Sequence, residues 1–343
     1  EVTADTHEPT DVYWFPNQWD HRNSPERIAA RRVITTYLDF IAYGIDSYHG
    51  SEQEWLSYRA LQRSVALASD GVTTISADVA RQLMDNVPLM DPVRVRALPL
   101  GIDHVVREGV RSERPESLPP QTRPFVLVLG NDFRHKNRDF AIKVWSALLE
   151  QGVSCDLVLA GLHVRGSSSR HAEQELLGGH VNLRGDVHLL DHVDESSRLW
   201  LLENAAAFLY PTSAEGFVFV PFGAAMWGTA TSFVSFGSLR ELASASGLPV
   251  SWSVDAFTSD LQKLLTDTRF ADNRVAQILS SGNSLRWEVF AQGFVDFSKS
   301  ILALPRSVGL PAIEHGTSQA NATRARSRRS VSGVYRRIRR WNQ

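Results

Sequence analysis

The sequence predicts an α/β fold built from two doubly wound, Rossmann-like lobes. From residue 125 onward, short apolar runs alternate with helical patterns at intervals suited to a strand, a crossover helix and a parallel strand. The chain of 343 residues is long enough for two domains that each bury a core. Its 43% hydrophobic and 22% charged residues are typical of a soluble globular protein.

Residues 117–304 are predicted to form the second lobe. Between its first two strands, a helix places its apolar residues from Phe140 to Leu148 on one face, as a helix covering a sheet should. Strands and crossover helices in this order predict a Rossmann-like unit. The predicted strands are Phe125 to Leu129, Asp156 to Ala160, Val181 to Leu183, Ala206 to Tyr210 and Thr231 to Ser235.

Residues 1–116 repeat this pattern more sparsely and predict an incomplete N-terminal lobe, the back half of a second Rossmann-like unit. The Pro-rich, charged segment from Arg111 to Arg123 is the natural hinge between the lobes. The predicted strands are Val12 to Phe15, Arg32 to Tyr37, Val72 to Ser76 and Val93 to Leu98, with helices at Glu54 to Ala68 and Ala77 to Asp85.

Residues 305–343 form a basic tail. Eight Arg and no acidic residue lie between Arg324 and Arg340, so the rest of the chain is acidic. Up to Trp341, apolar residues recur at helical spacing with Arg on the other face, which is the pattern of a helix on an anionic membrane. A solvated, disordered tail is the alternative. No basic fold accompanies these Arg residues, so no nucleic acid partner is expected.

The chain is expected to be cytoplasmic, with the basic tail as a peripheral contact to the inner face of the membrane. No apolar run approaches the roughly 20 residues of a membrane-spanning helix, and residues 1–20 lack the order of a signal peptide. The sequence begins with Glu1 rather than Met, so we expect a processed chain or a fragment.

A basic turn follows the strand predicted at Phe125 to Leu129. Gly130 and Asn131 end this strand, and a helix opens at Arg134 and Lys136. In α/β sheets, phosphates bind where the carboxyl end of a parallel strand meets a helix start, and a Lys there adds a mobile positive charge. The turn therefore predicts a phosphate-binding loop, with an ordinary loop bearing solvated bases as the alternative.

An acidic turn follows the strand predicted at Ala206 to Tyr210. Gly216 allows close approach of the backbone to a ligand, and the amides from Gly216 through Phe217 to Val218 are expected to face an anion. Glu215 is then placed to accept hydrogen bonds from sugar hydroxyls. A capped turn without a ligand is the alternative reading of this segment alone.

Together the two turns resemble a known family. The segment from Gly130 to Asn137 looks like the G...KN loop of retaining family 4 glycosyltransferases, and Glu215-Gly216-Phe217 resembles the EGFG element of that family. The likeness covers residues 125–302 in order and spacing. It implies the GT-B architecture, in which two Rossmann-like lobes close over a nucleotide sugar.

The resemblance also implies roles for individual residues. Lys136, helped by Arg134, would neutralise the donor diphosphate, and Glu215 would hold the transferred sugar. Gly185 to Val187 would lie beside the nucleobase. Glu241 would lie near the donor at the end of the following strand.

The chain departs from the family pattern at three positions. The second Glu of the family, usually a ligand for the ribose hydroxyls, falls on Gly223, and Val218 replaces the last Gly of the EGFG element. In the first lobe, Asp39 loosely fits a strand end that normally carries His-Asp, but the His is absent. The glycine-rich loop that usually opens this lobe lies before Glu1 or does not exist.

No metal and no cofactor are expected. No two Asp residues stand two positions apart, so the paired-carboxylate metal clamp of another transferase architecture has no candidate. The charge of the leaving group would be met by Lys136, Arg134 and the amides at helix starts.

These observations predict a retaining glycosyltransferase that moves a sugar from a nucleotide diphosphate sugar to a saccharide or lipid-linked acceptor, in polysaccharide or glycoconjugate biosynthesis. The departures leave open a non-catalytic protein that binds a nucleotide sugar or a partner enzyme. A sugar-nucleotide epimerase is a further alternative, because that activity also uses two facing Rossmann-like lobes. A membrane-adhering scaffold rests on the Arg tail alone.

Overall fold

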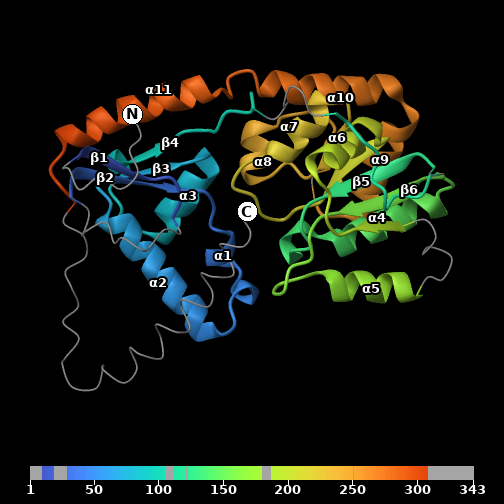
Figure 1. Cartoon of the computed structure of the whole chain (residues 1–343), viewed down its shortest axis with the longest axis horizontal. Coiled ribbons are helices and arrows are strands. Elements are labelled where there is room, and N and C mark those ends of the chain that lie inside the picture. The colour runs from blue at the N-terminus through green and yellow to red at the C-terminus, as the bar shows by residue number, and fades with distance from the viewer. Residues whose placement is uncertain are drawn as a thin grey trace. The chain divides into compact units, whose positions relative to one another are not determined.

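The computed structural model describes residues 10–18, 29–104, 111–120, 123–179, 187–249 and 251–307. Within these ranges the chain forms two parallel sheets, one in each lobe (Figure 1). The predicted α/β fold with parallel sheets is therefore confirmed. Gly185, the strand expected at Val181 to Leu183 and the tail from Arg324 to Trp341 lie outside the described residues, so the expectations placed on them stay predictions.

The first lobe is built around four strands. Its elements in chain order are β1 (Thr10–Phe15), β2 (Ala30–Tyr37), α1 (Ile41–Gly44), the 3₁₀ helix η2 (Asp46–Tyr48), α2 (Glu52–Ala68), β3 (Gly71–Thr74), α3 (Ala77–Asn86), the 3₁₀ helix η3 (Pro92–Arg94) and β4 (Val95–Ala97). All four strands are parallel, in the order β1-β2-β3-β4. Strand β4 is shorter than predicted, because Asp91 accepts a hydrogen bond from Val93 and Pro92 favours a helical turn there.

The first sheet is covered on both faces. On one face, α2 and α3 bring Ala66 and Leu83 into a cluster with Tyr37 and Val72. This two-sided cover explains why β2 and β3 are β-branched and buried almost throughout, as expected for central parallel strands.

The second lobe is built around five strands. Its elements in chain order are β5 (Phe125–Leu129), the 3₁₀ helix η4 (Arg134–Lys136), α4 (Arg138–Glu150), β6 (Asp156–Ala160), α5 (Arg170–Gly179), β7 (Val187–Leu190), α6 (Glu195–Asn204), β8 (Ala207–Tyr210), α7 (Phe219–Met226), β9 (Thr231–Phe233), α8 (Gly237–Leu242), α9 (Val254–Thr266) and α10 (Thr268–Ser281). The chain then continues into α11 (Trp287–Ala303). The strands are parallel, in the order β7-β6-β5-β8-β9.

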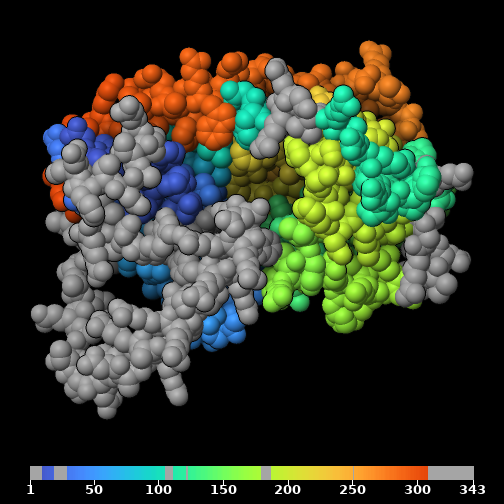
Figure 2. Space-filling view, in the orientation of Figure 1, coloured from blue at the N-terminus to red at the C-terminus, as the bar shows by residue number. Residues whose placement is uncertain are grey.

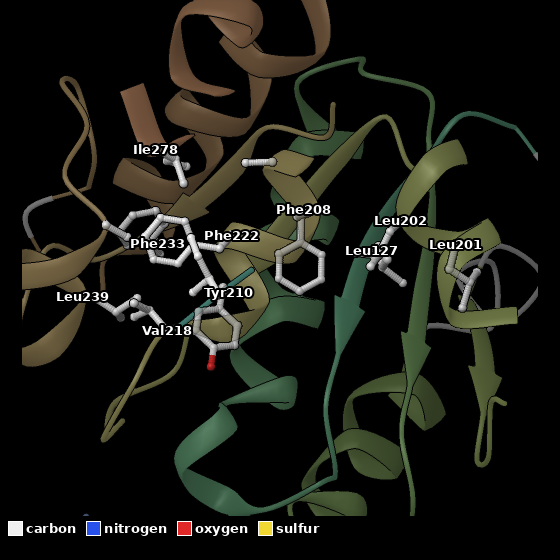
Figure 3. Packing of buried hydrophobic residues seen from close by; sticks show 14 of the residues in the cluster. Leu127, Leu201, Leu202, Phe208, Tyr210, Val218, Phe222, Phe233, Leu239 and Ile278 are labelled. Atoms are coloured by element: carbon white, nitrogen blue, oxygen red, sulfur yellow. The ribbon is translucent and has the colours of Figure 1, made fainter. Parts of the chain in front are cut away.

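Side chains alternate between the two faces of this sheet. Val126 and Val128 point into a cluster covered by α4 and α9, whereas Leu127 points into the cluster covered by α6, α7 and α8. In the second cluster, Phe208 and Tyr210 of β8 pack near Phe222 of α7 (Figure 3). Helices on both faces give the doubly wound arrangement that the sequence predicts.

The strand that pairs with β6 at the edge of the second sheet begins at Val187. The described strand is β7, in which Val187 pairs with Leu157 and Leu190 pairs with Ala160. Nε2 of His188 in this strand donates a hydrogen bond at 3.1 Å to the carboxylate of Asp156, so a polar residue occupies a strand position that hydrophobic patterning alone would not select.

The last helix returns to the first lobe. Phe297 and Ile301 of α11 pack against Ile34 of β2, and Arg32 donates a hydrogen bond at 3.1 Å to the carbonyl oxygen of Ile301. Figure 2 shows α11 as an orange band at the surface beside the blue first strands. The sequence assigns residues 287–304 to the second lobe, but this helix supplies the second cover of the first sheet.

No helix in the described ranges combines the length and the apolar character needed to cross a membrane.

Candidate active site

The site lies where the strand order of the second sheet reverses. From β5 the chain moves outward to β6 and β7, and it then places β8 on the other side of β5. Ligands of open α/β sheets bind beyond the carboxyl ends of the strands at such a reversal. Lys136 follows β5 and Glu215 follows β8, so the topology directs both residues to this place.

Lys136 and Glu215 form an ion pair. Nζ of Lys136 lies 2.5 Å from Oε1 of Glu215, and the two side chains are 21% and 10% exposed. The hydroxyl of Tyr210 donates a hydrogen bond to the same Oε1 at 2.5 Å. Two donors on one oxygen fix the orientation of the carboxylate while part of the pair stays accessible.

Tyr210 belongs to both the core and the site. Its ring lies in the buried cluster under α7, and its hydroxyl oxygen points away from that cluster (Figure 3). Burial raises the pKa of Tyr210 well above its ordinary value, and the charge of Glu215 and the hydrogen bond to it add to the rise. The phenol therefore keeps its proton and serves as a donor to Glu215. The sequence did not single out this role.

Contacts between the two turns hold Lys136 and Glu215 together. The backbone of Asn137 is left-handed, with φ 52°. Its side-chain Nδ2 donates a hydrogen bond at 2.8 Å to the carbonyl oxygen of Pro211. The amide of Ser213 donates to the carbonyl oxygen of His135 at 2.8 Å, and the hydroxyl of Thr212 donates to that oxygen at 3.2 Å. The basic and acidic turns are thus bonded to each other along their length.

The basic turn depends on close backbone packing. Gly130 has φ 145° and Gly161, at the end of β6, has φ 146°, which are conformations that favour glycine. A Cβ atom at Gly161 would overlap the carbonyl oxygen of Gly130. The strand ends of β5 and β6 therefore approach more closely than side chains would allow.

His135 anchors the basic turn under the first lobe. Burial lowers the pKa of His135 to about 3, and the charge of Lys136 contributes to the fall. Tyr48 of η2 bonds to Nδ1 of His135, and its ring stacks on Phe133 with centroids 5.0 Å apart. Burial raises the pKa of Tyr48, as do the charges of Asp39 and Glu215. The neutral phenol of Tyr48 therefore donates a hydrogen bond to Nδ1 of the neutral His135 imidazole.

The acidic turn also contacts the first lobe. A Cβ atom at Gly216 would overlap the carbonyl oxygen of Leu38 and lie 3.1 Å from Cβ of Asp39. The hydroxyl of Ser76 donates to the carbonyl oxygen of Gly216 at 3.0 Å. Glycine is therefore required at residue 216 because the two lobes touch there through their backbones.

Asp39 lies near the ion pair. Burial raises the pKa of Asp39 to about 6, and the charge of Glu215 adds to the rise, whereas the hydrogen bond from Ile41 and the charge of Lys136 oppose it. Gln18 fixes the backbone at this point by donating to the carbonyl oxygen of Asp39 and accepting from the amide of Leu38, both at 2.9 Å. The carboxyl of Asp39 is therefore poised to change its charge near pH 6.

The other predicted site residues surround this centre in different ways. Asn131 is half-buried and Arg134 is exposed at the start of η4. Phe217 and Val218 are buried and pack into the core below the site. Gly223 is buried within α7, so this position presents no side chain that could bind a ribose.

Two expectations differ from the described geometry. Val187 is the first residue of β7 and pairs with Leu157, so it lies at the amino end of the strand, away from the edge that carries Lys136. Glu241 was expected near the donor, but its carboxylate accepts hydrogen bonds from the amides of Ala77 and Asp78 in the first lobe. The loop that follows β7 at the site edge begins at Asp191, directly after the last residue of this strand.

A buried Asp beside the site was missed in the sequence. Asp132 accepts hydrogen bonds at 2.7 Å from the amide of Val164 and from Nδ1 of His163, and at 3.2 Å from Arg170. Burial alone would raise the pKa of Asp132, but the hydrogen bonds from His163 and Val164 lower it. Asp132 thus holds the loop after β6. The sequence feature that could have identified Asp132 was its place in the basic turn, two residues after Gly130.

Among the described residues, no three His, Cys, Asp or Glu side chains gather closely enough to hold a metal ion.

Comparison with known proteins agrees with this geometry. Residues 110–278 match the family described as glycosyl transferases group 1. This range contains both turns and all the strands of the second sheet. The second lobe is therefore similar to a glycosyl transferases group 1 domain. No curated protein matches the chain.

Solved structures resemble the chain across both lobes. The sucrose-phosphate synthase of Thermosynechococcus elongatus is 18% identical with a TM-score of 0.64, and the match covers 85% of this chain and 74% of that one. The UDP-forming α,α-trehalose-phosphate synthase of Burkholderia xenovorans, in complex with glucose-6-phosphate, is 14% identical with a TM-score of 0.62, over 78% and 67%. A glycosyltransferase involved in lipopolysaccharide biosynthesis is 17% identical with a TM-score of 0.57, over 77% of each chain.

The chain has the GT-B fold. The architecture that the resemblance implied is therefore confirmed. At sequence identities this low, structural similarity establishes the fold alone. The substrates must be argued from the site.

Proposed function

We propose that this protein is a retaining glycosyltransferase that moves a sugar from a nucleoside diphosphate donor to a saccharide or lipid-linked acceptor, in the biosynthesis of a polysaccharide or glycoconjugate. The observation that carries the proposal is the ion pair between Lys136 and Glu215 at the strand reversal of the second lobe. The glycosyl transferases group 1 match over this lobe supports the same reaction class.

Lys136 neutralises the donor diphosphate. Its ammonium lies at the carboxyl end of β5, and Arg134 is exposed one residue before the buried His135. A diphosphate carries more negative charge than a carboxylate and therefore draws the ammonium away from Glu215 when the donor binds. Preorganised positive charge at the leaving group is the largest contribution that such a site makes to the rate.

Glu215 holds the transferred sugar. Once Lys136 faces the diphosphate, the carboxylate keeps its hydrogen bond from Tyr210 and accepts hydrogen bonds from the sugar hydroxyls. The anomeric carbon is then placed between the diphosphate and the first lobe. Fixing both groups in one geometry removes much of the entropic cost of the reaction.

The acceptor hydroxyl approaches from the side of Asp39. Its oxygen forms the bond to the anomeric carbon, the bond from that carbon to the diphosphate oxygen breaks, and the departing phosphate takes the acceptor proton. Reaction on the face of the leaving group retains the anomeric configuration. Contacts between Gly216 and Leu38 bring the first lobe against the reacting centre, where exclusion of water favours transfer over hydrolysis.

We propose that the reaction needs no divalent cation and no other cofactor. Lys136 and Arg134 supply the positive charge that a metal supplies in other transferases. Nucleotide release that continues at its full rate after treatment with EDTA is the expected result, and restoration of a lost rate by Mg²⁺ or Mn²⁺ would refute this part of the proposal.

The test of the function is nucleotide release from a panel of UDP-, GDP-, ADP-, CDP- and dTDP-sugars, each with and without saccharide acceptors. Lys136→Met and Glu215→Gln should each lower transfer by about 100-fold or more, because each removes a charge that acts in the transition state. Lys143→Met, which removes an exposed Lys from α4, is the matched control and should keep the wild-type rate.

The stereochemistry is read separately by nuclear magnetic resonance of the anomeric proton in the product. The donor configuration is expected. Tight binding of a nucleotide without turnover of any donor would favour a non-catalytic role, and conversion of the donor sugar without an acceptor would favour an epimerase.

A further inference from the structure

Glu241 connects the second lobe to the start of a helix in the first lobe. Its Oε1 accepts a hydrogen bond from the amide of Ala77 at 2.8 Å, and its Oε2 accepts one from the amide of Asp78 at 2.9 Å. Ala77 and Asp78 are the first two residues of α3. The carboxylate thus satisfies two of the amides that a helix start leaves unpaired, at the end of the helix where negative charge is favoured.

Ser76 completes the start of α3 and links it to the acidic turn. Its hydroxyl oxygen accepts a hydrogen bond from the amide of Val79 at 3.2 Å, which makes Ser76 the N-cap of the helix. The same hydroxyl donates to the carbonyl oxygen of Gly216 at 3.0 Å. The start of α3 is therefore bonded to the second lobe through both Glu241 and Gly216.

Helix α8, which carries Glu241, holds the acidic turn from its other side. The hydroxyl of Ser238 donates to the carbonyl oxygen of Glu215 at 3.1 Å. Gly237 has φ 47°, and a Cβ atom there would lie 3.0 Å from Oδ2 of Asp78. The carbonyl group of Glu215 is thus held by α8, and the next carbonyl group, that of Gly216, is held by the N-cap of α3. Glu241 connects these two helices.

We propose that Glu241 is a positioning residue that locks the first lobe onto the acidic turn and so fixes Glu215 in its reactive orientation. The effect on the reaction rests on the proposed function, whereas the lock itself is a property of the fold. In this role Glu241 contacts α3 and not the donor.

Two substitutions break the lock from opposite sides. Glu241→Gln keeps the shape of the side chain but replaces one accepting oxygen with a nitrogen that cannot accept from an amide. Ala77→Pro removes the amide that binds Oε1 and leaves Glu241 unchanged. Ala77 is exposed and is the first residue of α3, and Ser76 before it is extended with φ −157°, so Pro is accommodated there.

Hydrogen exchange at the amide of Asp78 tests the lock without any assay of activity. Exchange should become about tenfold or more faster in both variants, because each removes one of the two hydrogen bonds that hold the Glu241 carboxylate at the start of α3. Thr268→Pro is the matched control, since Thr268 is the exposed first residue of α10 in the second lobe. Wild-type exchange at Asp78 in both lock variants would overturn the proposal.

Kinetics then test the effect on Glu215. Both variants should lower kcat by about tenfold and leave the KM for the donor nearly unchanged, which lies within the usual range of coupling between sites. The double variant should lose no more than either single variant, because both remove the same contact. A raised donor KM in Glu241→Gln with wild-type kinetics in Ala77→Pro would identify Glu241 as a donor ligand and overturn the lock. A wild-type protein without turnover would contradict the proposed function, and the exchange result would still decide the lock.

Discussion

Nζ of Lys136 lies 2.5 Å from Oε1 of Glu215, so the cation proposed to bind the diphosphate and the anion proposed to hold the sugar are bound to each other. Donor binding must therefore replace one charge-assisted contact with another. The two residues share this contact but have opposite charges. Their removal should consequently affect nucleotide binding in opposite directions.

The first prediction concerns this opposition. Lys136→Met should weaken the binding of the nucleoside diphosphate that wild type binds best by about 10- to 100-fold, the usual value of a hydrogen bond to a charged group. Glu215→Gln should tighten the same binding a few-fold, because the ammonium is then released from its partner. Isothermal titration measures both constants. Equal weakening by the two substitutions would show that the ion pair acts as a single binding unit.

The second prediction concerns Tyr210. Tyr210→Phe keeps the buried ring and removes the hydrogen bond to Oε1 of Glu215. Transfer should fall by about five- to tenfold, the typical net contribution of one hydrogen bond. Nucleotide affinity should change much less, because Lys136 loses only a long hydrogen bond of 3.4 Å to the phenol and keeps its ion pair with Glu215. Tyr13→Phe in β1 is a control for the loss of a phenol elsewhere, and a fall in affinity as large as the fall in rate would argue against an orienting role.

The third prediction concerns pH. Burial raises the pKa of Asp39 to about 6 from an ordinary value of 3.8. Between these values the folded protein holds a proton that the unfolded chain has lost, so the contribution of Asp39 to the free energy of unfolding falls as pH rises from about 4 to 6 and is then constant. Asp39→Asn removes this loss and keeps an acceptor for the amide of Ile41.

Urea unfolding of wild type and Asp39→Asn at about pH 4 and pH 7.5 measures the effect. The variant should gain about 1–3 kcal/mol at the higher pH and little at the lower pH, after allowance for partial exposure of the carboxyl. An equal gain at both pH values would mean that the carboxyl of Asp39 is not perturbed.

The fourth prediction concerns the backbone contact between the lobes. A Cβ atom at Gly216 would overlap the carbonyl oxygen of Leu38. Gly216→Ala should therefore lower the free energy of unfolding by about 1–3 kcal/mol, the usual cost of overpacking, and should lower transfer more than nucleotide binding. Thermal unfolding and titration measure the two effects. Gly166→Ala is the control, because no atom lies within 4 Å of an added Cβ there, and an equally stable Gly216→Ala would contradict the contact.

Much of this fold could be predicted from the sequence because parallel strands buried on both faces are continuous apolar runs. Strands β5 and β6 match their predicted ranges. The meeting of Lys136 and Glu215 was predictable for the same reason, since both follow strands whose carboxyl ends lie at one edge of one sheet.

Features that depend on distant residues were not predictable. His188 lies within β7 and its side chain bonds to Asp156, a contact that hydrophobic patterning does not reveal. The partner of Glu241 lies 164 positions away at Ala77, and no local pattern marks that contact. Helix α11 reads as an ordinary amphipathic helix, and only the packing of Phe297 on Ile34 reveals which sheet it covers.

The return of α11 to the first sheet determines how this chain can be recombined with its structural relatives. A chimera that grafts a foreign second lobe onto this first lobe must keep residues 287–303 of the original chain, because Ile34 would otherwise lose Phe297 and Ile301. If the foreign segment instead extended to the last residue of α11, a foreign helix would cover the native first sheet. Its side chains would then have to fit closely against Gly71, which Ile301 contacts in this chain. The interchangeable module therefore ends before Trp287, although the chain continues well beyond it.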